Sequence, residues 1–168
     1  MDFRFKLYRV TTAIVLMISG IFTFMLLSSI LFLGTNFGSI VFLLSMGACF
    51  IHSVLSLYLQ RSLLLPEIPL KESTPGGMRF MGTIGLIFSV LLILSGLTIL
   101  LVTPEQMKAE IDNLPPDQQA AVKQTLIAPI GVFLLVVGSL IVLNIGLSFR
   151  YLRQWLQLQG GRSEEHEE

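Results

Sequence analysis

Four long apolar stretches that contain no Asp, Glu, Lys or Arg constrain this chain more than any other feature. They cover residues 10–33, 40–59, 81–102 and 127–149. A helix needs about 20 apolar residues to cross a bilayer core of roughly 30 Å, and each stretch meets that length. The chain of 168 residues is 53% hydrophobic and 13% charged, which is too apolar for a water-soluble domain of this size. We therefore predict an all-α membrane protein with four transmembrane helices in an antiparallel, up-down-up-down bundle.

The predicted bundle forms a single domain over residues 1–158. Three basic residues precede the first apolar stretch, as in a signal peptide, but that stretch is longer than the cleavable segment of about 7–15 residues. We interpret it as a retained span. The fourth helix is expected to continue past Phe149 and to stop near Gly160-Gly161. The acidic tail that remains, residues 159–168, is predicted to be disordered.

Lys and Arg are distributed unevenly outside the four stretches. Nine of the eleven lie in the N-terminal arm, the connection 60–80 and the C-terminal tail, and two lie in the connection 103–126. Because an excess of basic residues marks cytoplasmic segments, both termini are predicted to be cytoplasmic, in the plasma (inner) membrane. Four aromatic residues at the same end are expected at the headgroups: Tyr8, Tyr58, Tyr151 and Trp155.

The connections differ in character. Gly34 and Gly38 flank a short polar segment, and we interpret them as a tight turn in preference to a GxxxG dimerisation face. The middle connection contains Pro66, Pro69 and Pro75-Gly76-Gly77, which predict an irregular loop.

The outer connection, residues 103–126, is predicted to form a short helical hairpin. Thr103, Pro104 and Gln106 have the spacing of a capping box with proline at the first helical position. A second helix is expected over residues 117–124, and Pro129 is expected to mark the break before the fourth span. The acidic excess of this connection suits either a docking surface or a solvated cap, and we favour the cap.

Small and polar residues share one face of each span. Lipid tails are as apolar as leucine, so such residues concentrate where helices approach one another. The predicted buried polar layer consists of Ser19, Ser45, Cys49, His52, Ser56, Ser89 and Asn144. Close helix packing is predicted at Gly82, Gly85, Gly96, Gly131 and Gly138.

Four members of this layer lie at nearly the same depth when a rise of about 1.5 Å per residue is assumed. We therefore expect hydrogen bonds among Ser19, His52, Ser89 and Asn144, because an unpaired polar group in hydrocarbon is costly. Asn144 and Ser148 project away from the glycine face of their own helix, so Asn144 is expected to contact a second neighbour or a second subunit.

His52 is the one ionisable residue at membrane depth. Desolvation disfavours its charged form, so a neutral imidazole is expected. A functional interpretation makes it a proton relay, a ligand contact or a haem ligand; a structural one makes it an interhelical hydrogen-bonding group. We favour the second, since no carboxylate or second histidine accompanies it. The methionines that could complete a haem site are Met17, Met25, Met46 and Met81.

No catalytic constellation is evident. Cys49 and His52 are three residues apart and could pair, but the same spacing belongs to the packing face. His166 lies among glutamates in the tail, which offers a metal ion no fixed geometry. We predict that the protein is not an enzyme and that it has no metal site and no cofactor.

Two functions remain in competition. We favour a non-enzymatic scaffold or accessory subunit of a membrane complex, whose partners are the lipid bilayer and a membrane protein or a second copy, with no role for nucleic acid. The alternative is a small-solute or ion transporter or channel, whose polar path passes Ser45, His52, Ser56 and Asn144. The absence of charge at membrane depth favours the first.

Overall fold

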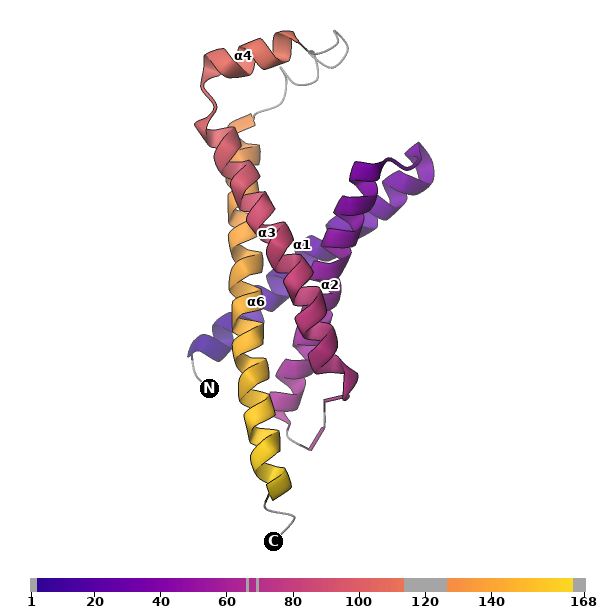
Figure 1. Cartoon of the computed structure of the whole chain (residues 1–168), viewed down its shortest axis with the longest axis vertical. Coiled ribbons are helices and arrows are strands. Elements are labelled where there is room, and N and C mark those ends of the chain that lie inside the picture. The colour runs from indigo at the N-terminus through magenta and orange to yellow at the C-terminus, as the bar shows by residue number, and fades with distance from the viewer. Residues whose placement is uncertain (1–2, 66, 69, 114–126, 165–168) are drawn as a thin grey trace. The chain divides into compact units, whose positions relative to one another are not determined.

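The computed structural model describes residues 3–65, 67–68, 70–113 and 127–164. Within those ranges the chain is helical and contains no strand (Figure 1). The helices are α1 (Phe3–Leu33), α2 (Phe37–Leu64), α3 (Ser73–Leu101), α4 (Pro104–Asp112) and α6 (Ile127–Glu164).

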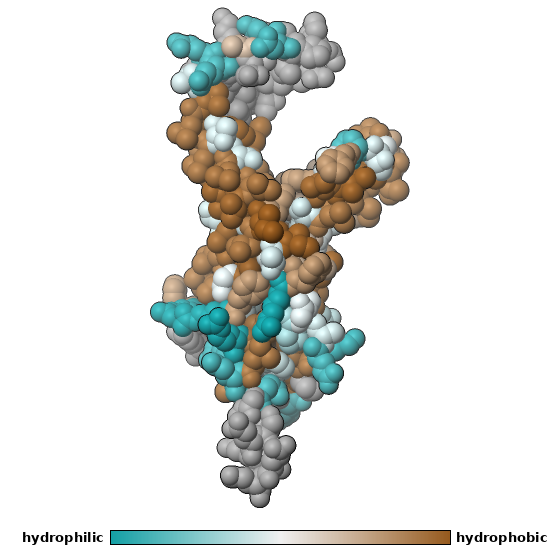
Figure 2. All heavy atoms as spheres, viewed as in Figure 1, coloured by the Kyte–Doolittle hydropathy of each residue, from teal (hydrophilic) through white to brown (hydrophobic). Residues whose placement is uncertain are grey.

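Four of the described helices are long and apolar enough to cross a membrane. They are Phe3–Leu33, Phe37–Leu64, Ser73–Leu101 and Ala128–Gln159. Apolar side chains cover the visible surface of these segments, whereas hydrophilic side chains gather on α4 and around the basic end of unit 1 defined below (Figure 2). The predicted all-α membrane fold with four transmembrane helices is confirmed, and the chain is an integral, multi-pass membrane protein.

The helices extend beyond the predicted spans, because helical structure continues past the hydrocarbon. α1 has 31 residues, or about 46 Å at 1.5 Å per residue, against a bilayer core of roughly 30 Å. The irregular loop predicted at Pro75-Gly76-Gly77 is wrong, since α3 begins at Ser73. Proline is tolerated in a first helical turn, where its missing N–H has no helical acceptor. Pro129 occupies the equivalent part of α6, which begins at Ile127.

The C-terminal helix is also longer than expected. α6 is helical through Glu164, beyond the predicted stop near Gly160-Gly161 and into the predicted tail. Residues 165–168 lie outside the described residues, so their disorder stays a prediction.

A tight turn joins α1 to α2, as predicted. Gly34 has φ 87°, in the left-handed region that glycine adopts without steric cost. Asn36 then caps α2, because its Oδ1 accepts a hydrogen bond of 2.7 Å from the Ser39 N–H.

The capping box predicted at the start of α4 is present. The Thr103 side chain accepts from the Gln106 N–H, and the Gln106 side chain accepts from the Thr103 N–H. The second helix that was predicted over residues 117–124 lies outside the described residues.

The chain packs as two compact units. Unit 1 comprises Met1–Phe88 and Leu140–Glu168, and unit 2 comprises Ser89–Ser139. Within unit 1, α1 and α2 lie side by side as an antiparallel hairpin (Figure 1). The basic end of unit 1 is the end that carries the exposed residues Arg61, Lys71, Arg79, Arg150 and Arg153. The single domain of residues 1–158 stays a prediction.

An apolar and aromatic core lies near that basic end. Its buried members are Phe5, Tyr8, Leu59, Leu70, Met78, Tyr151 and Leu152. The Tyr8 and Tyr151 rings stack at a centroid distance of 5.1 Å, and the Phe5 ring meets Tyr151 edge-on at 5.4 Å. Tyr8 and Tyr151 are therefore buried between helices and do not expose their rings to lipid, and their depth at the headgroups stays a prediction. Tyr58, by contrast, is 56% exposed.

In unit 2, glycines bring α3 and α6 close together. A Cβ atom added at Gly96 would lie 2.8 Å from the Gly131 carbonyl oxygen, and one added at Gly138 would lie 2.9 Å from the Ser89 carbonyl oxygen. Ser89 of α3 lies against Gly138 of α6, and Gly96, further along α3, lies against Gly131, which comes earlier in α6. The two segments are therefore antiparallel. A backbone neighbour cannot yield as a side chain can, which makes these glycines hard to replace.

Candidate functional site: a buried polar cluster

Seven side chains of unit 1 form a buried polar cluster. Each is at most 5% exposed, and they are Tyr8 and Thr12 from α1, His52, Ser56 and Gln60 from α2, and Asn144 and Ser148 from α6. On each helix, neighbouring cluster residues are four positions apart, so they lie on the same face and are separated by about one helical turn. The cluster therefore joins three helices of the unit.

Thr12 is the centre of one half of the cluster. Its Oγ1 lies 2.7 Å from the Tyr8 carbonyl oxygen and 2.7 Å from the Asn144 Oδ1, and it accepts a 2.9 Å hydrogen bond from the Gln60 Nε2. A hydroxyl has one proton and cannot donate to both oxygens. Rotating the Asn144 amide by 180° keeps the same shape and turns its NH2 toward Thr12. Thr12 then donates once and accepts twice, which satisfies it completely.

Three hydroxyls form the other half. The Ser56 and Ser148 Oγ atoms are 2.8 Å apart, and the Ser148 Oγ donates to the Tyr8 hydroxyl at 3.2 Å. The Tyr8 hydroxyl in turn donates to the Ser56 carbonyl oxygen at 3.4 Å. This triangle links α1, α2 and α6 without any charged group.

His52 joins α2 to α3 instead of bonding to the hydroxyls. Its Nδ1 lies 3.1 Å from the Met78 carbonyl oxygen. A carbonyl oxygen only accepts, so Nδ1 carries the proton and Nε2 is left with a lone pair. Nε2 is buried and has no hydrogen-bond partner among the described residues. The imidazole meets the Phe149 ring edge-on at 6.0 Å.

The hydrogen bonds predicted among Ser19, His52 and Asn144 are wrong. The Ser19 Oγ donates within its own helix, to the Val15 carbonyl oxygen at 2.6 Å, and Asn144 bonds to Thr12. Equal depth is not enough for contact, because the side chains must also face one another. Ser89 is fully buried in unit 2.

Two other predicted members of the polar layer behave differently. Ser45 is only half-buried, and its Oγ donates to the Val41 carbonyl oxygen at 2.8 Å, so it departs from the prediction of a buried group. Cys49 is buried, and its Sγ would lie 3.2 Å from a Cβ at Gly85. In the part of the chain that the structure describes, Cys49 and His52 are not joined by a hydrogen bond.

The two predicted packing glycines of unit 1 lie against this site. A Cβ atom at Gly82 would come within 2.7 Å of the Phe149 Cζ and 3.0 Å of the His52 Cε1. One at Gly85 would lie 3.1 Å from the Ile145 Cδ1. Glycine at these positions lets α3 approach α2 and α6 closely.

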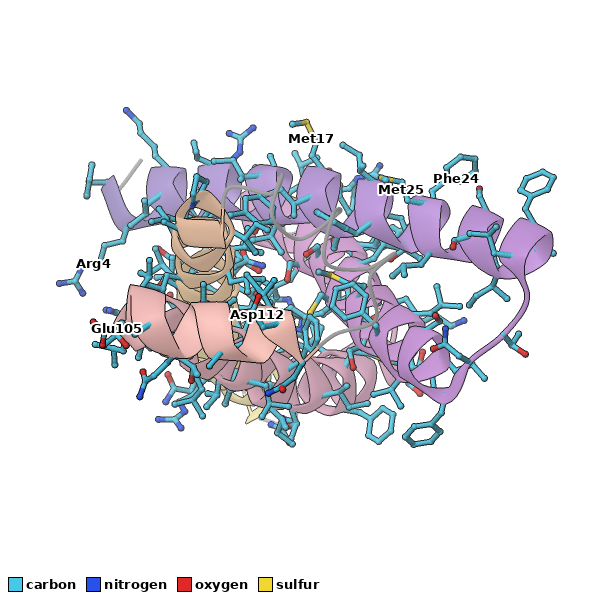
Figure 3. All side chains as sticks on the ribbon, turned by 90° about the horizontal axis from the view of Figure 1, so that it is seen from above. Arg4, Met17, Phe24, Met25, Glu105 and Asp112 are labelled. Atoms are coloured by element: carbon cyan, nitrogen blue, oxygen red, sulfur yellow. The ribbon has the colours of Figure 1, made fainter. Side chains whose placement is uncertain are left out.

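The residues considered as ligands of a metal ion or haem are placed as follows. The described part of the chain holds no group of three His, Cys, Asp or Glu residues suited to a metal ion. Met17 and Met25 are 65% and 59% exposed and project outward from α1 (Figure 3), and Met46 is buried. His52 thus has a free Nε2 without a described second ligand.

Sequence reasoning missed the Met78 carbonyl oxygen as the partner of His52, and the predicted layer also lacked four cluster members: Tyr8, Thr12, Gln60 and Ser148. Tyr8 was assigned to the headgroups because tyrosine is common there. A repeat of hydrogen-bonding residues at a spacing of four, Tyr8 with Thr12 and Asn144 with Ser148, would have placed it in the cluster. The Met78 carbonyl leaves no trace in the sequence.

No protein-family model, curated protein or solved structure matches this chain. Its function is therefore argued from its residues alone.

Proposed function

We propose that this protein is a non-enzymatic scaffold or accessory subunit of a membrane complex. The main support for the proposal is that only one half of the α1–α2 hairpin contains buried residues. In α1 the buried residues lie between Phe5 and Ser19, and in α2 they lie between Met46 and Ser62. The distal half of the hairpin, residues 20–45, contains no buried residue. Its surface is available to a partner.

The composition of the distal half supports contact with a protein helix in addition to lipid. Hydroxyl residues in membrane helices gather where helices meet, and this half contains Thr23, Ser28 and Ser29.

The polar cluster supports a structural role over catalysis. Its hydroxyl and amide groups bond to one another across three helices, so they fasten the helices together. The cluster contains no carboxylate, and its one imidazole bonds through Nδ1 to a backbone oxygen. General acid–base chemistry needs a titratable group within reach of a substrate, and a side chain that is 1% exposed offers none.

Site-specific photo-crosslinking tests the proposal. A photoreactive residue is placed at Phe24, which is 72% exposed and points outward from α1 (Figure 3), in the membranes of the native cell. The matched control is Leu91, an exposed apolar residue of α3. A discrete protein adduct at Phe24 and lipid adducts alone at Leu91 are expected. Lipid adducts alone at both positions would reject an accessory role for this surface.

We place both termini in the cytoplasm of a plasma (inner) membrane, on the strength of the distribution of Lys and Arg. Single cysteines at Lys6 and at Ala109 in a Cys49→Ala background report the orientation. A membrane-impermeant maleimide should label the Ala109→Cys variant in intact cells and the Lys6→Cys variant only after permeabilisation. The reverse pattern would overturn the orientation.

The second candidate function is transport past His52. It is favoured by one contact: Phe149 packs on the imidazole and also lines a cavity of about 400 Å³ with Arg79 and Arg153. All of these residues belong to unit 1. A movement of the Phe149 ring would connect the free Nε2 with that cavity.

Flux measurements in liposomes separate the two functions. A transporter should lose flux in the His52→Ala variant and gain leak in the Phe149→Ala variant, while Tyr58→Phe serves as a control on the exposed face of α2. Flux that is absent for a broad panel of ions and small solutes would remove the transport hypothesis and leave the accessory role.

A further inference from the structure

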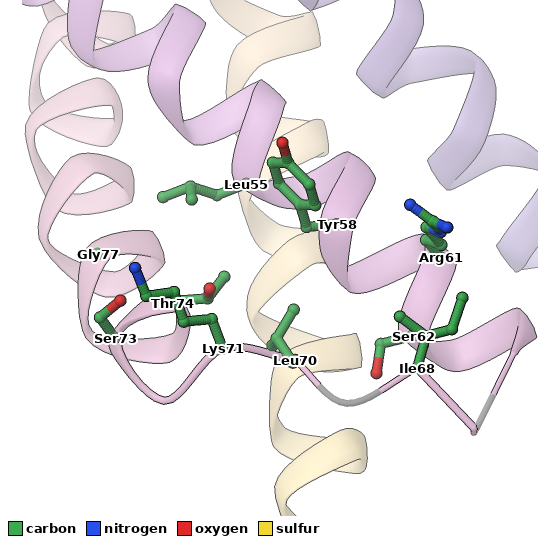
Figure 4. Close-up of a pocket in the computed structure, with 10 residues that line it drawn as sticks. All are labelled: Leu55, Tyr58, Arg61, Ser62, Ile68, Leu70, Lys71, Ser73, Thr74 and Gly77. Atoms are coloured by element: carbon green, nitrogen blue, oxygen red, sulfur yellow. The ribbon is translucent and has the colours of Figure 1, made fainter.

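A cavity of about 660 Å³ opens at the basic end of unit 1, between α2 and the start of α3 (Figure 4). Its volume falls within the range of about 300–1,000 Å³ that is typical of ligand pockets. Its walls come from α2, from the connection after it and from the first turns of α3. The lining residues are Leu55, Tyr58, Arg61, Ser62, Ile68, Leu70, Lys71, Ser73, Thr74 and Gly77.

The charged residues of the cavity wall are both cationic. Arg61 and Lys71 line it, and neither forms an ion pair with a described carboxylate. Glu67 and Glu72 belong to the same connection but do not line the cavity. Two cationic side chains without a close ion pair beside a hollow attract an anion, and basic pockets between membrane helices suit phospholipid headgroups.

Thr74 adds an independent indication of a ligand. It is only 7% exposed, it lines the cavity, and its hydroxyl is not among the fully enclosed polar atoms, so the cavity can reach it. It stands in the first turn of α3, which carries no acidic residue. The N-terminus of a helix has a partial positive charge that favours an anion. Gly77 contributes no side chain that would fill the space.

Apart from Ser62, Ser73 and the Tyr58 hydroxyl, the rest of the wall is apolar. Leu55 and Tyr58 belong to the membrane-spanning helix α2, and Leu55 points across toward α3 (Figure 4). Ile68 and Leu70 complete this side. The cavity therefore combines a cationic, hydroxyl-bearing end with an apolar wall that continues onto a membrane helix. A soluble anion needs only the first of these features, whereas a phospholipid uses both.

We propose that this cavity binds the phosphate group of an anionic phospholipid drawn from the surrounding bilayer. Lys71 and the Thr74 hydroxyl hold the phosphate, and the partial positive charge at the start of α3 favours it. Arg61 supplies further positive charge at the opposite end of the cavity. Leu55 and Tyr58 contact the glycerol and the first part of the acyl chains. The site is independent of the accessory role and of any transport path.

The protein contains its own reporter of this site. Trp155 is the single tryptophan of the chain, and its Nε1 donates a 3.0 Å hydrogen bond to the Ser62 Oγ. Ser62 lines the cavity. Fluorescence of Trp155 therefore reports on a lipid that occupies the cavity.

The test uses the full-length protein in phosphatidylcholine nanodiscs that contain a minor fraction of lipid with brominated acyl chains, which quench tryptophan. Brominated phosphatidylglycerol is compared with brominated phosphatidylcholine at equal fractions. Quenching by general contact with the bilayer is common to both lipids, so the excess for phosphatidylglycerol measures selective binding. Wild-type protein should show a clear excess. Each basic residue near an anionic lipid contributes about fivefold in the binding constant, so Lys71→Met should weaken the preference by about that factor and Arg61→Gln by less, because Arg61 lies at the opposite end of the cavity.

Two further variants separate a defined site from general surface charge. Lys6→Met removes the same charge from the N-terminal arm, outside the cavity wall, and should retain the preference. Thr74→Val preserves shape, removes the hydroxyl and should weaken the preference without changing the net charge. Thermal unfolding confirms that each variant is folded. An equal loss in Lys6→Met and Lys71→Met, or no preference in wild type, would overturn the site. Abolition of the preference by millimolar inorganic phosphate would overturn its assignment to a lipid in favour of a soluble phosphate.

Discussion

The Thr12 Oγ1 and the Asn144 amide lie 2.7 Å apart, although 132 residues separate them in the sequence. This contact holds the first membrane helix against the last within unit 1. Hydrogen bonds between membrane helices contribute about 0.6 kcal/mol on average and up to roughly 2 kcal/mol. The removal of one partner adds a penalty of about 1–3 kcal/mol, because the other is left buried and unpaired. Removing one member of the cluster around Thr12 is therefore expected to cost more free energy through the partner that is left buried and unpaired than through the lost hydrogen bond itself.

Replacing Tyr8 by phenylalanine removes a hydroxyl that bonds to α2 and α6 and keeps the stacked ring. We expect the free energy of unfolding to fall by about 1 kcal/mol, the usual net value of a hydrogen bond. Tyr58→Phe is the matched control, because Tyr58 is exposed, and it should change stability little. Unfolding by sodium dodecyl sulfate in mixed micelles measures both. Equal stability of Tyr8→Phe and wild type would show that the hydroxyl triangle contributes nothing.

The α3–α6 contact in unit 2 predicts a contrast between two glycines. Gly96→Ala places a methyl group 2.8 Å from the Gly131 carbonyl oxygen, and should destabilise by about 1–3 kcal/mol through overpacking. Gly146→Ala is the control, since no atom lies within 4 Å of its added Cβ. That substitution should leave stability unchanged or raise it by up to about 1 kcal/mol, because alanine favours the helix. If the two variants melt together, the Gly96 face does not contact another helix.

His52→Leu is expected to preserve the fold. The substitution removes the Nδ1 bond to Met78, but it also removes a buried Nε2 that has no described partner. The Met78 carbonyl lies inside α3, where a helical carbonyl also accepts from the N–H four residues later. The two effects oppose each other, so the change in unfolding free energy should stay within about 1 kcal/mol. A loss of several kcal/mol would mean that Nε2 binds something essential.

Cys49 should resist thiol reagents in the folded protein. It is the single cysteine, and it is 1% exposed beneath α3. Maleimide labelling is expected to be slow in mild detergent and rapid after denaturation, because reaction requires access to the thiolate. Rapid labelling of the folded protein would revive the hypothesis that Cys49 and His52 act as a pair.

Much of the architecture could be predicted because the bilayer imposes strong rules. The length of the apolar stretches was enough to find the four membrane helices. Gly34 indicated a turn, and the capping box at Thr103 indicated the start of a helix. Pro75 was misinterpreted, because a proline that breaks a helix interior is tolerated in a first turn. The rule for aromatic residues at the interface gave no indication that the Tyr8 and Tyr151 rings stack inside unit 1.

The candidate site was predictable only in part. Helical spacing correctly indicated that His52, Ser56 and Asn144 are buried, and it placed glycines where helices approach. Spacing gives the face and depth of a residue on its own helix, but not the rotation of that helix about its axis. The true partners, such as Thr12 for Asn144 and a backbone oxygen for His52, depend on that rotation. The cavity at Lys71 depends on the path of an irregular connection, which no periodic pattern specifies.

A double-mutant cycle between Thr12 and Asn144 tests most directly whether the polar cluster fastens the helices. Thr12→Val and Asn144→Leu remove the two partners singly and together, and unfolding free energies are measured in the same mixed micelles. The account predicts that the double variant is less destabilised than the sum of the single variants, with a coupling of about 0.6–1.7 kcal/mol. Strictly additive losses, with no coupling, would contradict it.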